Sequence, residues 1–405
     1  MATEKIGNID LVKQLNSAVV YRLIDRKGPI SRIQIAEISQ LAPASITKIT
    51  RQLIERGLIK EVAQQASTGG RRPISLTCEY QPFQAIAIRI GRDNIELSLY
   101  DLSGHELANM KADFPYTSQD SLVKGLINHI TAFIAKNNTI ITELLAIGIS
   151  LPGLLDPDTG RVSYIPNIEV EDLHLTEIIE LQFKISCFIG NDIRSLALAE
   201  HYFGVSTDVQ DSIVISVHNG TGAGIMVNGS IFLGHNRNVG EIGHIQVDPL
   251  GEHCQCGNFG CLETVASNPA LINHVKTRMA QGYPSILQDK EQITVKDICE
   301  AALNYDELAK QAILQLGNHL GKVIAMTINL FNPEKIIIAG DITQAKQVLF
   351  PIIQRCIDSQ SLPTFRQELP IVESTLFHQP TIGAFATIKR SMLDGILLQR
   401  ILEKK

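Results

Sequence analysis

The amino-acid sequence predicts a small helical module at the N-terminus and a larger α/β body behind it. Over residues 11–56, apolar residues recur at helical spacing between short turns, whereas over residues 83–341 apolar strands alternate with helices. The charge divides near the same place. Residues 1–76 hold 12 Lys and Arg against 6 Asp and Glu, which is +6, so the remainder of a chain with net charge −6 carries −12. A basic module on an acidic body suits contact with phosphates.

The length of 405 residues exceeds one ordinary core, so we expect two or three domains. We place them at residues 1–78, 83–195 and 196–405, the last with a dimerisation surface and a returning C-terminal helix. Apolar residues make up 44% and charged residues 19%, as in globular proteins. No apolar run approaches the roughly 18 residues that span a bilayer. Residues 1–10 lack the apolar core of a secretory signal, so we expect a cytoplasmic protein.

Three helices are expected in the N-terminal module. Asp10 is a suitable N-cap for the first, over about residues 11–26, and Gly28-Pro29 ends it. Ser31 caps the second, over residues 32–39. The third spans residues 44–56, because Pro43 is tolerated in a first helical turn. We assign the apolar faces of the first two helices to Leu11, Leu15, Val19 and Leu23, and to Ile33, Ala36 and Ile38.

The third helix has one apolar and one polar face. Its inward side chains are Ile46, Ile49, Leu53 and Ile54. Its outward side chains, which suit base edges or phosphates in a major groove, are Ser45, Thr47, Lys48, Arg51 and Gln52. Strands over residues 58–62 and 74–76 flank a tip at residues 68–72, where Arg71 and Arg72 suit a narrow minor groove. This layout is typical of a winged helix-turn-helix and favours DNA binding over a merely solvated helix face.

Beyond residue 83, strands alternate with helices, and this predicts α/β layers. Several predicted strands end in a glycine-rich or acidic turn: Leu151-Pro152-Gly153, Asn191-Asp192, His218 to Gly224, and Gly340-Asp341. The strands are expected over residues 83–90, 94–101, 144–149, 185–190, 212–217 and 335–339, with helices over residues 194–202 and 306–330.

The seven cysteines indicate a metal cluster rather than disulfides. Cys254, Cys256 and Cys261 fall close together after His244, and the glycines between them let the backbone wrap an ion. One imidazole and three thiolates suit tetrahedral Zn²⁺ with no open position for water, so we interpret the site as structural. The alternative is a set of free thiols, because the Cys-x-Cys spacing alone is not specific. The other cysteines are expected to be ordinary buried thiols: Cys78, Cys187, Cys299 and Cys356.

Short motifs over nearly the whole chain resemble the ROK family, which joins sugar kinases and sugar-responsive repressors. They are Leu151-Pro152-Gly153, Asn191-Asp192, Gly220-Thr221-Gly222, Glu241-Ile242-Gly243-His244 and the run from Cys254 to Glu263. Residues 42–48 and 69–73 are similar to the repressors of the family. The resemblance implies a two-lobed, actin-like and ribonuclease-H-like body behind the winged helix-turn-helix, and it favours zinc over free thiols.

The resemblance also implies a sugar pocket. Its ring contacts would be Asn191, Asp192, Glu241, His244 and Glu263, with Asn167 and Gly153 as weaker candidates. Carboxylates suit this role because each accepts from two hydroxyls. In the kinases of the family, the position matched by Asp192 is the general base. For each residue the alternative is a helix cap or a solvated side chain, and Asp192, which opens a helix, is a natural N-cap.

Kinase activity is not expected, because phosphoryl transfer needs ATP phosphates held by backbone amides and a metal. ROK kinases carry an Asp-x-Gly-Gly-Thr turn after the first strand. Here the corresponding run from Arg89 to Asp93 lacks the leading Asp and the double glycine, and Asp341 places a carboxylate where a nucleotide would sit. An active sugar kinase with a DNA-binding head is the second interpretation.

The resemblance to amino-sugar repressors implies N-acetylglucosamine 6-phosphate as inducer. Its phosphate would approach Asp192, and like charges repel. We therefore assign the phosphate to the amides of Gly220, Thr221 and Gly222, with His218 and Arg194 as helpers. The expected protein is a homodimer or tetramer on a palindromic operator in double-stranded DNA. The third interpretation is a repressor held by a sugar-transporter subunit.

Overall fold

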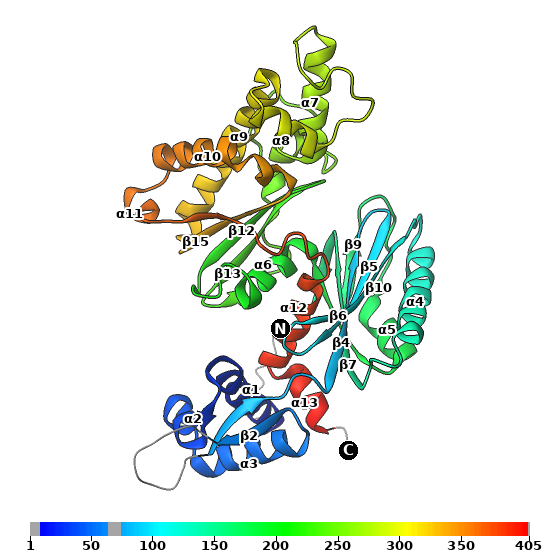
Figure 1. Ribbon diagram of the computed structural model, residues 1–405, viewed down its shortest axis with the longest axis vertical. Coiled ribbons are helices and arrows are strands. Elements are labelled where there is room, and N and C mark those ends of the chain that lie inside the picture. The colour runs from blue at the N-terminus through cyan, green and yellow to red at the C-terminus, as the bar shows by residue number, and fades with distance from the viewer. Residues whose placement is uncertain (1–8, 64–73, 404–405) are drawn as a thin grey trace. The chain divides into compact units, whose positions relative to one another are not determined.

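The structure, a computed structural model, describes residues 9–63 and 74–403 (Figure 1). The chain forms two compact units, unit 1 with Met1–Gly190 and Ala384–Lys405, and unit 2 with Asn191–Gly383. It therefore crosses between the units twice, and the first crossing comes earlier than the expected boundary after residue 195. The C-terminal segment, expected in the second lobe, belongs to unit 1 because its helices pack there.

The N-terminal module has the expected winged helix-turn-helix architecture. Its described elements are α1 (Ile9–Lys27), β1 (Ile30–Ser31), α2 (Arg32–Ser39), α3 (Pro43–Glu55), β2 (Ile59–Ala63) and β3 (Ile74–Cys78), with sheet order β1-β3-β2. Ser31 forms a capping box with Gln34 at the start of α2, and Gln40 ends this helix in the left-handed region. Arg71 and Arg72, the expected wing contacts, lie outside the described residues.

The expected apolar faces of α1 and α2 are only partly right, because Val19, Leu23 and Ala36 are half-buried and no residue of either predicted face is fully buried. On α1, Leu11 and Leu15 are exposed, and the buried apolar side chains are Ala18, Val20, Tyr21 and Ile24. On α2, Ile33 and Ile38 are exposed and Ile35 is fully buried. Each helix carries apolar residues on more than one face, so spacing alone does not select the buried one. Contacts of α1 with α2, β3 and α13 (Ile396–Glu403) select it in the folded protein.

The two units carry five-stranded sheets of the same order, which confirms the two-lobed fold class. Counted along the chain, the first strand of each sheet pairs antiparallel with the second strand and parallel with the fourth. Unit 1 has the order β11-β7-β4-β5-β6, and unit 2 has β14-β13-β12-β15-β16. The strands of unit 1 are β4 (Phe83–Ile90), β5 (Asn94–Asp101), β6 (Glu106–Asp113), β7 (Glu143–Leu151) and β11 (Ser186–Asn191). Those of unit 2 are β12 (Ser212–Val217), β13 (Thr221–Val227), β14 (Ser230–Ile231), β15 (Lys335–Ala339) and β16 (Ile371–Glu373).

Helices complete both units, and unit 1 also has a small second sheet. Unit 1 adds α4 (Gln119–Lys136), α5 (Leu175–Phe183), α13 and a sheet of order β10-β9-β8, formed by β8 (Leu154–Asp156), β9 (Arg161–Tyr164) and β10 (Leu173–His174). The helix α12 (Ile382–Leu393) starts at the second crossing. Unit 2 adds α6 (Asp192–Phe203), α7 (Asn268–Ala280), α8 (Val295–Leu303), α9 (Glu307–Phe331), α10 (Lys346–Gln360), α11 (Pro363–Arg366) and three short 3-10 helices. Among the described residues, no helix is both long and apolar enough to span a membrane.

A fully buried carboxylate fixes α6, the helix that begins at the candidate site. Glu200 Oε1 accepts from the hydroxyl of Ser374 at 2.5 Å and the amide of Leu376 at 3.1 Å, and its Oε2 accepts from the amide of Val205 at 2.9 Å. Three donors on one carboxylate satisfy the groups that burial would otherwise leave unpaired. The bonds tie the end of α6 to the segment after β16.

Replacement of Glu200 by glutamine is expected to lower the free energy of unfolding by about 2–4 kcal/mol. Glutamine puts an NH₂ group against a backbone N–H donor, so at least one buried amide loses its acceptor. The shift of the urea midpoint measures the effect. Glu291→Gln, at an exposed position of the same unit, is the control and should change stability little. An unchanged midpoint for Glu200→Gln would contradict the role of this carboxylate.

Candidate functional site

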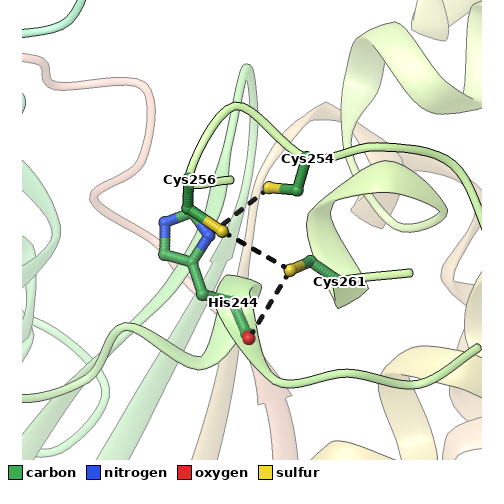
Figure 2. Close-up of side chains that lie close together, drawn as sticks. All are labelled: His244, Cys254, Cys256 and Cys261. Atoms are coloured by element: carbon green, nitrogen blue, oxygen red, sulfur yellow. Dashed lines mark hydrogen bonds between the residues drawn. The ribbon is translucent and has the colours of Figure 1, made fainter. Parts of the chain in front are cut away.

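The four expected metal ligands meet in unit 2, on the chain that runs from the 3-10 helix η1 (Ile242–His244) to η2 (Leu262–Thr264) (Figure 2). His244 Nδ1 lies 3.6 Å from Cys254 Sγ, and Cys256 Sγ lies 3.7 Å from Cys261 Sγ. All four ligand atoms fall within 4.8 Å of one another. A tetrahedron with metal bonds of about 2.3 Å to sulfur and about 2.0 Å to nitrogen has edges of about 3.6–3.8 Å. The donor set and its spacing therefore fit a tetrahedral metal ion.

Backbone hydrogen bonds shape the loop that carries the cysteines. Cys254 N donates to Asn258 O at 2.7 Å, and Gly260 N donates to Glu252 O at 2.8 Å. A side chain at position 260 would collide with Asp248 O, and its φ of +62° lies in the left-handed region, so glycine is required there. A backbone hydrogen bond from Asn258 lowers the pKa of the Cys256 thiol, whereas burial and the neighbouring sulfurs raise the pKa of Cys261 to about 12.

The remaining cysteines are buried, as expected. Burial raises the pKa of Cys78 and of Cys299 to about 12. Both therefore stay protonated thiols at neutral pH. The cysteines with metal-ligand geometry among the described residues are the three beside His244.

Glu263 closes against the start of β13. Its Oε2 accepts from the amide of Thr221 at 3.1 Å, and a Cβ built at Gly220 would lie 2.5 Å from the same oxygen. Gly243 of η1 likewise has no room for a side chain, because Thr221 O lies against it. The loop that carries the cysteines, η2 and the β12–β13 hairpin thus meet around the carboxylate of Glu263. Small residues at these contacts allow the close approach.

Arg194, expected to help hold a phosphate, holds the segment before η1 in this structure. Its guanidinium donates to Val239 O at 2.6 Å, to Asn238 Oδ1 at 3.0 Å and to Glu241 Oε1 at 3.3 Å. The side chain is 6% exposed. Burial lowers the pKa of Arg194, and the carboxylate of Glu241 partly offsets this.

The start of α6 lies beside β13. Asn191 is the N-cap, since its Oδ1 accepts from the amides of Ile193 at 3.0 Å and Arg194 at 3.2 Å, so the capping side chain is not that of Asp192. Asp192 instead occupies the first helical position. The helix lies close to the strand because Gly222 and Gly224 leave room for Ile193 and Ala197. A Cβ at position 222 would lie 2.6 Å from Ile193 Cδ1, and a Cβ at position 224 would lie 2.5 Å from Ala197 Cβ.

Five of the seven expected sugar contacts belong to unit 2: Asn191, Asp192, Glu241, His244 and Glu263. Arg194 ties Glu241 to the start of α6, and Glu263 lies against Gly243, next to His244. Asn167 is an exposed residue of unit 1 with φ of +69°. Gly153, the other weak candidate, also belongs to unit 1. These two residues therefore remain expectations from the sequence.

The assignment of a phosphate to Gly220, Thr221 and Gly222 stays a prediction, and the backbone there has other partners in this structure. Thr221 and Gly222 pair with Val217 and Ser216 in the antiparallel ladder of β12 and β13. The amide of Thr221 is already bound to Glu263. Glycines in this run allow the close approach of α6 and Glu263. Sequence alone does not separate this use of glycine from an anion-binding turn.

The turn that would hold ATP phosphates is closed by its own hydrogen bonds. Gly91 N donates to Asn94 O at 2.8 Å, and the hydroxyl of Tyr116 donates to Gly91 O at 3.0 Å. Arg89 stands opposite Glu96 in the β4–β5 ladder. In unit 2, Asp341 Oδ2 accepts from Asn268 Nδ2 at 3.4 Å. The amide of Gly91 is therefore already hydrogen-bonded within its own turn, where phosphoryl transfer would need amides directed at ATP phosphates.

The polar face of α3 is exposed, as expected. Ile46, Ile49 and Leu53 are buried, and Ile54 is half-buried. Thr47, Lys48, Arg51 and Gln52 are exposed and Ser45 is half-buried. Arg32, which sequence reasoning missed, fixes this helix: it donates to Thr50 Oγ1 at 3.0 Å and to Glu61 Oε1 at 2.8 Å.

Comparison with known proteins yields two family matches. The model of the ROK family matches residues 85–391, and that of the MarR family matches residues 14–64. The chain is 59% identical over 399 residues to the DNA-binding transcriptional dual regulator NagC of Escherichia coli K12, with 98% of each protein covered. The N-acetylglucosamine repressor of Shigella flexneri matches equally. The DNA-binding transcriptional repressor Mlc of Escherichia coli K12 is 36% identical, with all of both proteins covered.

Solved structures give the same picture. A ROK family transcriptional regulator, a homologue of the Escherichia coli Mlc protein, matches with a TM-score of 0.92 and 44% identity, over 97% of this chain and 100% of that one. A ROK family glucokinase from Streptomyces griseus, in complex with glucose and AMPPNP, matches with a TM-score of 0.65 and 25% identity, over 76% of this chain and 99% of that one.

Proposed function

The chain belongs to the ROK family, and from this premise we propose that it is a DNA-binding transcriptional repressor released from its operators by a sugar phosphate. The observation that carries the proposal is the exposed polar face of α3, in a MarR-like module, on a kinase-like body whose phosphate turns are closed. Relatives with matching length are named as transcriptional regulators and repressors. The proposal therefore separates the fold of the body from the chemistry of a kinase.

For DNA binding we assign the base and backbone contacts to α3 and the wing. The residues are Ser45, Thr47, Lys48, Arg51 and Gln52 on α3, with Arg71 and Arg72 on the wing. Two modules of a homodimer would read the two halves of a palindromic operator. Phosphate contacts by the basic residues make the affinity fall as salt rises.

For the body we propose a structural Zn²⁺ held by His244, Cys254, Cys256 and Cys261. When bound, the ion would fix the ring tautomer of His244 and the path of the loop. Nδ1 faces Cys254, so Nε2 is the nitrogen offered to a sugar hydroxyl. The other ring contacts are Asn191, Asp192, Glu241 and Glu263, which supply acceptors for hydroxyl groups.

We propose N-acetylglucosamine 6-phosphate as the inducer, because relatives of 59% identity are named N-acetylglucosamine repressors. Its binding must favour a state of the body that holds DNA weakly, since a ligand with equal affinity for both states shifts nothing. Where the phosphate binds, the negative charge of the carboxylates near the ring must be balanced by hydrogen-bond donors. The amide of Thr221 becomes available as such a donor only when Glu263 turns away from it.

A binding assay on operator DNA tests the function. Duplexes selected by the full-length protein from random sequence serve as probes in fluorescence anisotropy, with and without N-acetylglucosamine 6-phosphate. We expect tight, salt-dependent binding that the sugar phosphate weakens at least about fivefold. The same preparation should transfer no phosphate from ATP to N-acetylglucosamine. Indifference to duplex DNA, or sugar phosphorylation with turnover, would overturn the proposal.

Gly220→Val is expected to weaken the response to the sugar phosphate about tenfold while DNA affinity without the ligand changes less than about twofold. A Cβ at this position meets Glu263 Oε2, so the carboxylate must move from its place beside Thr221. The ratio of DNA dissociation constants with and without ligand measures the effect. Asn219→Ala, the exposed neighbour in the same hairpin, is the control. Equal loss of DNA binding and response would argue against a local effect on the pocket.

A further inference from the structure

We propose that a buried ion pair between Asp25 on α1 and Lys389 on α12 is the joint through which the body sets the position of the DNA-binding module. The inference rests on the proposed function and identifies the residues that would link its two parts. Lys389 Nζ lies 2.6 Å from Asp25 Oδ1, and the two side chains are only 11% and 10% exposed. The pair joins residues more than 360 positions apart in the chain.

The connecting segment shares the same carboxylate. The hydroxyl of Tyr80, between β3 and β4, donates to Asp25 Oδ1 at 3.0 Å. Lys389 Nζ also lies 5.5 Å from the centre of the Tyr80 ring, a cation–π distance. One oxygen therefore holds the first helix of the DNA-binding module, the linker to the body and a helix of the body in one arrangement. Burial, with the charge of Asp25 and neighbouring groups, raises the pKa of Tyr80, so its hydroxyl stays a donor.

The body holds α12 firmly at the other end. Gly148 of β7 packs against Ala384 O and Ile388, with no room for a Cβ. The rings of Phe385 and Tyr100 stack with centroids 4.9 Å apart and an interplanar angle of 27°. The helix begins at Ile382, beside the crossing at Gly383–Ala384. A single helix, packed against β7 and Tyr100, thus leads from the point where the chain leaves unit 2 to the ion pair.

Further hydrogen bonds continue the contact along the C-terminal segment. Arg22 donates to Leu393 O at 2.8 Å, and Gln14 donates to Asp394 O at 3.2 Å. Arg56, which follows the recognition helix α3, donates to Ile401 O at 3.2 Å and pairs with Glu143 at the start of β7. The DNA-binding module is therefore held to the body by contacts along α1 and directly after α3. Among these ionic contacts, Asp25–Lys389 is the most buried.

The chemistry of the pair favours positioning over stability. Removal of two charges from water is costly, and well-packed apolar residues in place of a buried ion pair are often as stable or more stable. An ion pair with a hydrogen bond from Tyr80 tolerates little sliding, because its energy depends on distance and direction, whereas an apolar contact accepts several arrangements. A fixed arrangement is what a body needs to set the spacing between two DNA-binding modules.

The test replaces the pair by apolar residues of similar size, Asp25→Leu with Lys389→Met, in the full-length protein. Two quantities are measured on selected operator duplexes: the change in DNA dissociation constant caused by N-acetylglucosamine 6-phosphate, and the loss of affinity when base pairs are inserted between the half-sites. Glu79→Leu with Lys60→Met is the control, because that pair also has a 2.6 Å contact but is more exposed and does not reach α12. Thermal melting and sugar-phosphate binding by calorimetry monitor the fold and the pocket.

We expect the double variant to bind the sugar phosphate normally yet to lose most of its DNA response, from at least about fivefold in the wild type to less than about twofold. It should also tolerate inserted base pairs better than the wild type. The single variant Lys389→Arg, which keeps the pair with Asp25, should retain both properties of the wild type. If the double variant does not fold, Tyr80→Phe removes one bond only and should show an intermediate loss.

The proposed role of the ion pair would be wrong if the folded double variant kept both the wild-type response and the wild-type dependence on half-site spacing. If only Tyr80→Phe folds, an unchanged response in that variant would contradict the role. These results leave the repressor function standing. A wild type whose DNA affinity ignores the sugar phosphate would instead overturn the proposed function, and the inference with it.

Discussion

Replacement of Lys48 and Arg51 together by alanine is expected to weaken operator binding about a thousandfold. A contact from a basic side chain to a base edge or phosphate contributes about 1–3 kcal/mol, and a dimer with two modules loses four such contacts. At the low end of that range, about 1 kcal/mol each, the loss of about 4 kcal/mol corresponds to about three powers of ten. Fluorescence anisotropy at fixed salt measures the affinity, and the salt dependence should become shallower because fewer counterions are released.

The fold should not share in this loss. Both side chains are exposed on α3, and the buried face of the helix is formed by Ile46, Ile49 and Leu53. The melting temperature should therefore stay close to that of the wild type. Lys13→Ala is the matched control, since Lys13 is an exposed basic residue of α1 that pairs only locally with Asp10. A double variant that binds operators within about threefold of the wild type would remove α3 from the DNA interface.

The sequence predicted best those features for which neighbouring residues allow only one interpretation. The face of α3 was predictable because its apolar residues lie on one side at helical spacing and its basic residues on the other. The grouping of His244 with three cysteines was predictable because such residues in a short stretch are typical of a metal site, and the family motifs favoured this interpretation over free thiols. The two-lobed body followed from family motifs rather than from periodicity.

The features that sequence missed depend on partners far away in the chain. On α1, either of two apolar stripes suits a buried face, and the choice between Leu15 and Tyr21 depends on contacts with α13, which lies at the other end of the sequence. The pairing of Asp25 with Lys389 has the same origin. Local patterns carry no information on such contacts, so no spacing rule finds them.

The glycine run after β12 shows a different kind of limit. Glycine permits both an anion-binding turn and a close helix–strand contact, and the sequence does not distinguish them. In the fold, Gly222 and Gly224 receive α6, and Glu263 takes the amide expected for a phosphate. Arg194, expected beside that phosphate, is used instead to hold Asn238, Val239 and Glu241. The roles of the residues expected in the pocket thus depend on which donors already have hydrogen-bond partners in the fold.

Loss of the metal is expected to abolish the response to the sugar phosphate, with at least a tenfold fall in ligand affinity. Four ligands tie residues 244–261 into one loop, and the flanking residues His244 and Glu263 belong to the proposed pocket. A structural zinc ion contributes about 10–16 kcal/mol to the ordering of small zinc-binding peptides, so its removal should loosen both flanks. Cys261→Ser and chelation of the wild type are the two routes. Mass spectrometry of metals measures the content, and calorimetry measures the sugar phosphate.

Two comparisons decide whether the effect belongs to the metal. Cys356→Ser changes a buried thiol of the same unit outside the cluster, so metal content and response should stay at wild-type values. DNA binding without ligand should persist in Cys261→Ser, because the DNA-binding module belongs to unit 1 and the cluster to unit 2. Return of Zn²⁺ to the chelated wild type should restore the response. A metal-free protein that still releases DNA at the same concentration of sugar phosphate would show that the cluster does not shape the pocket.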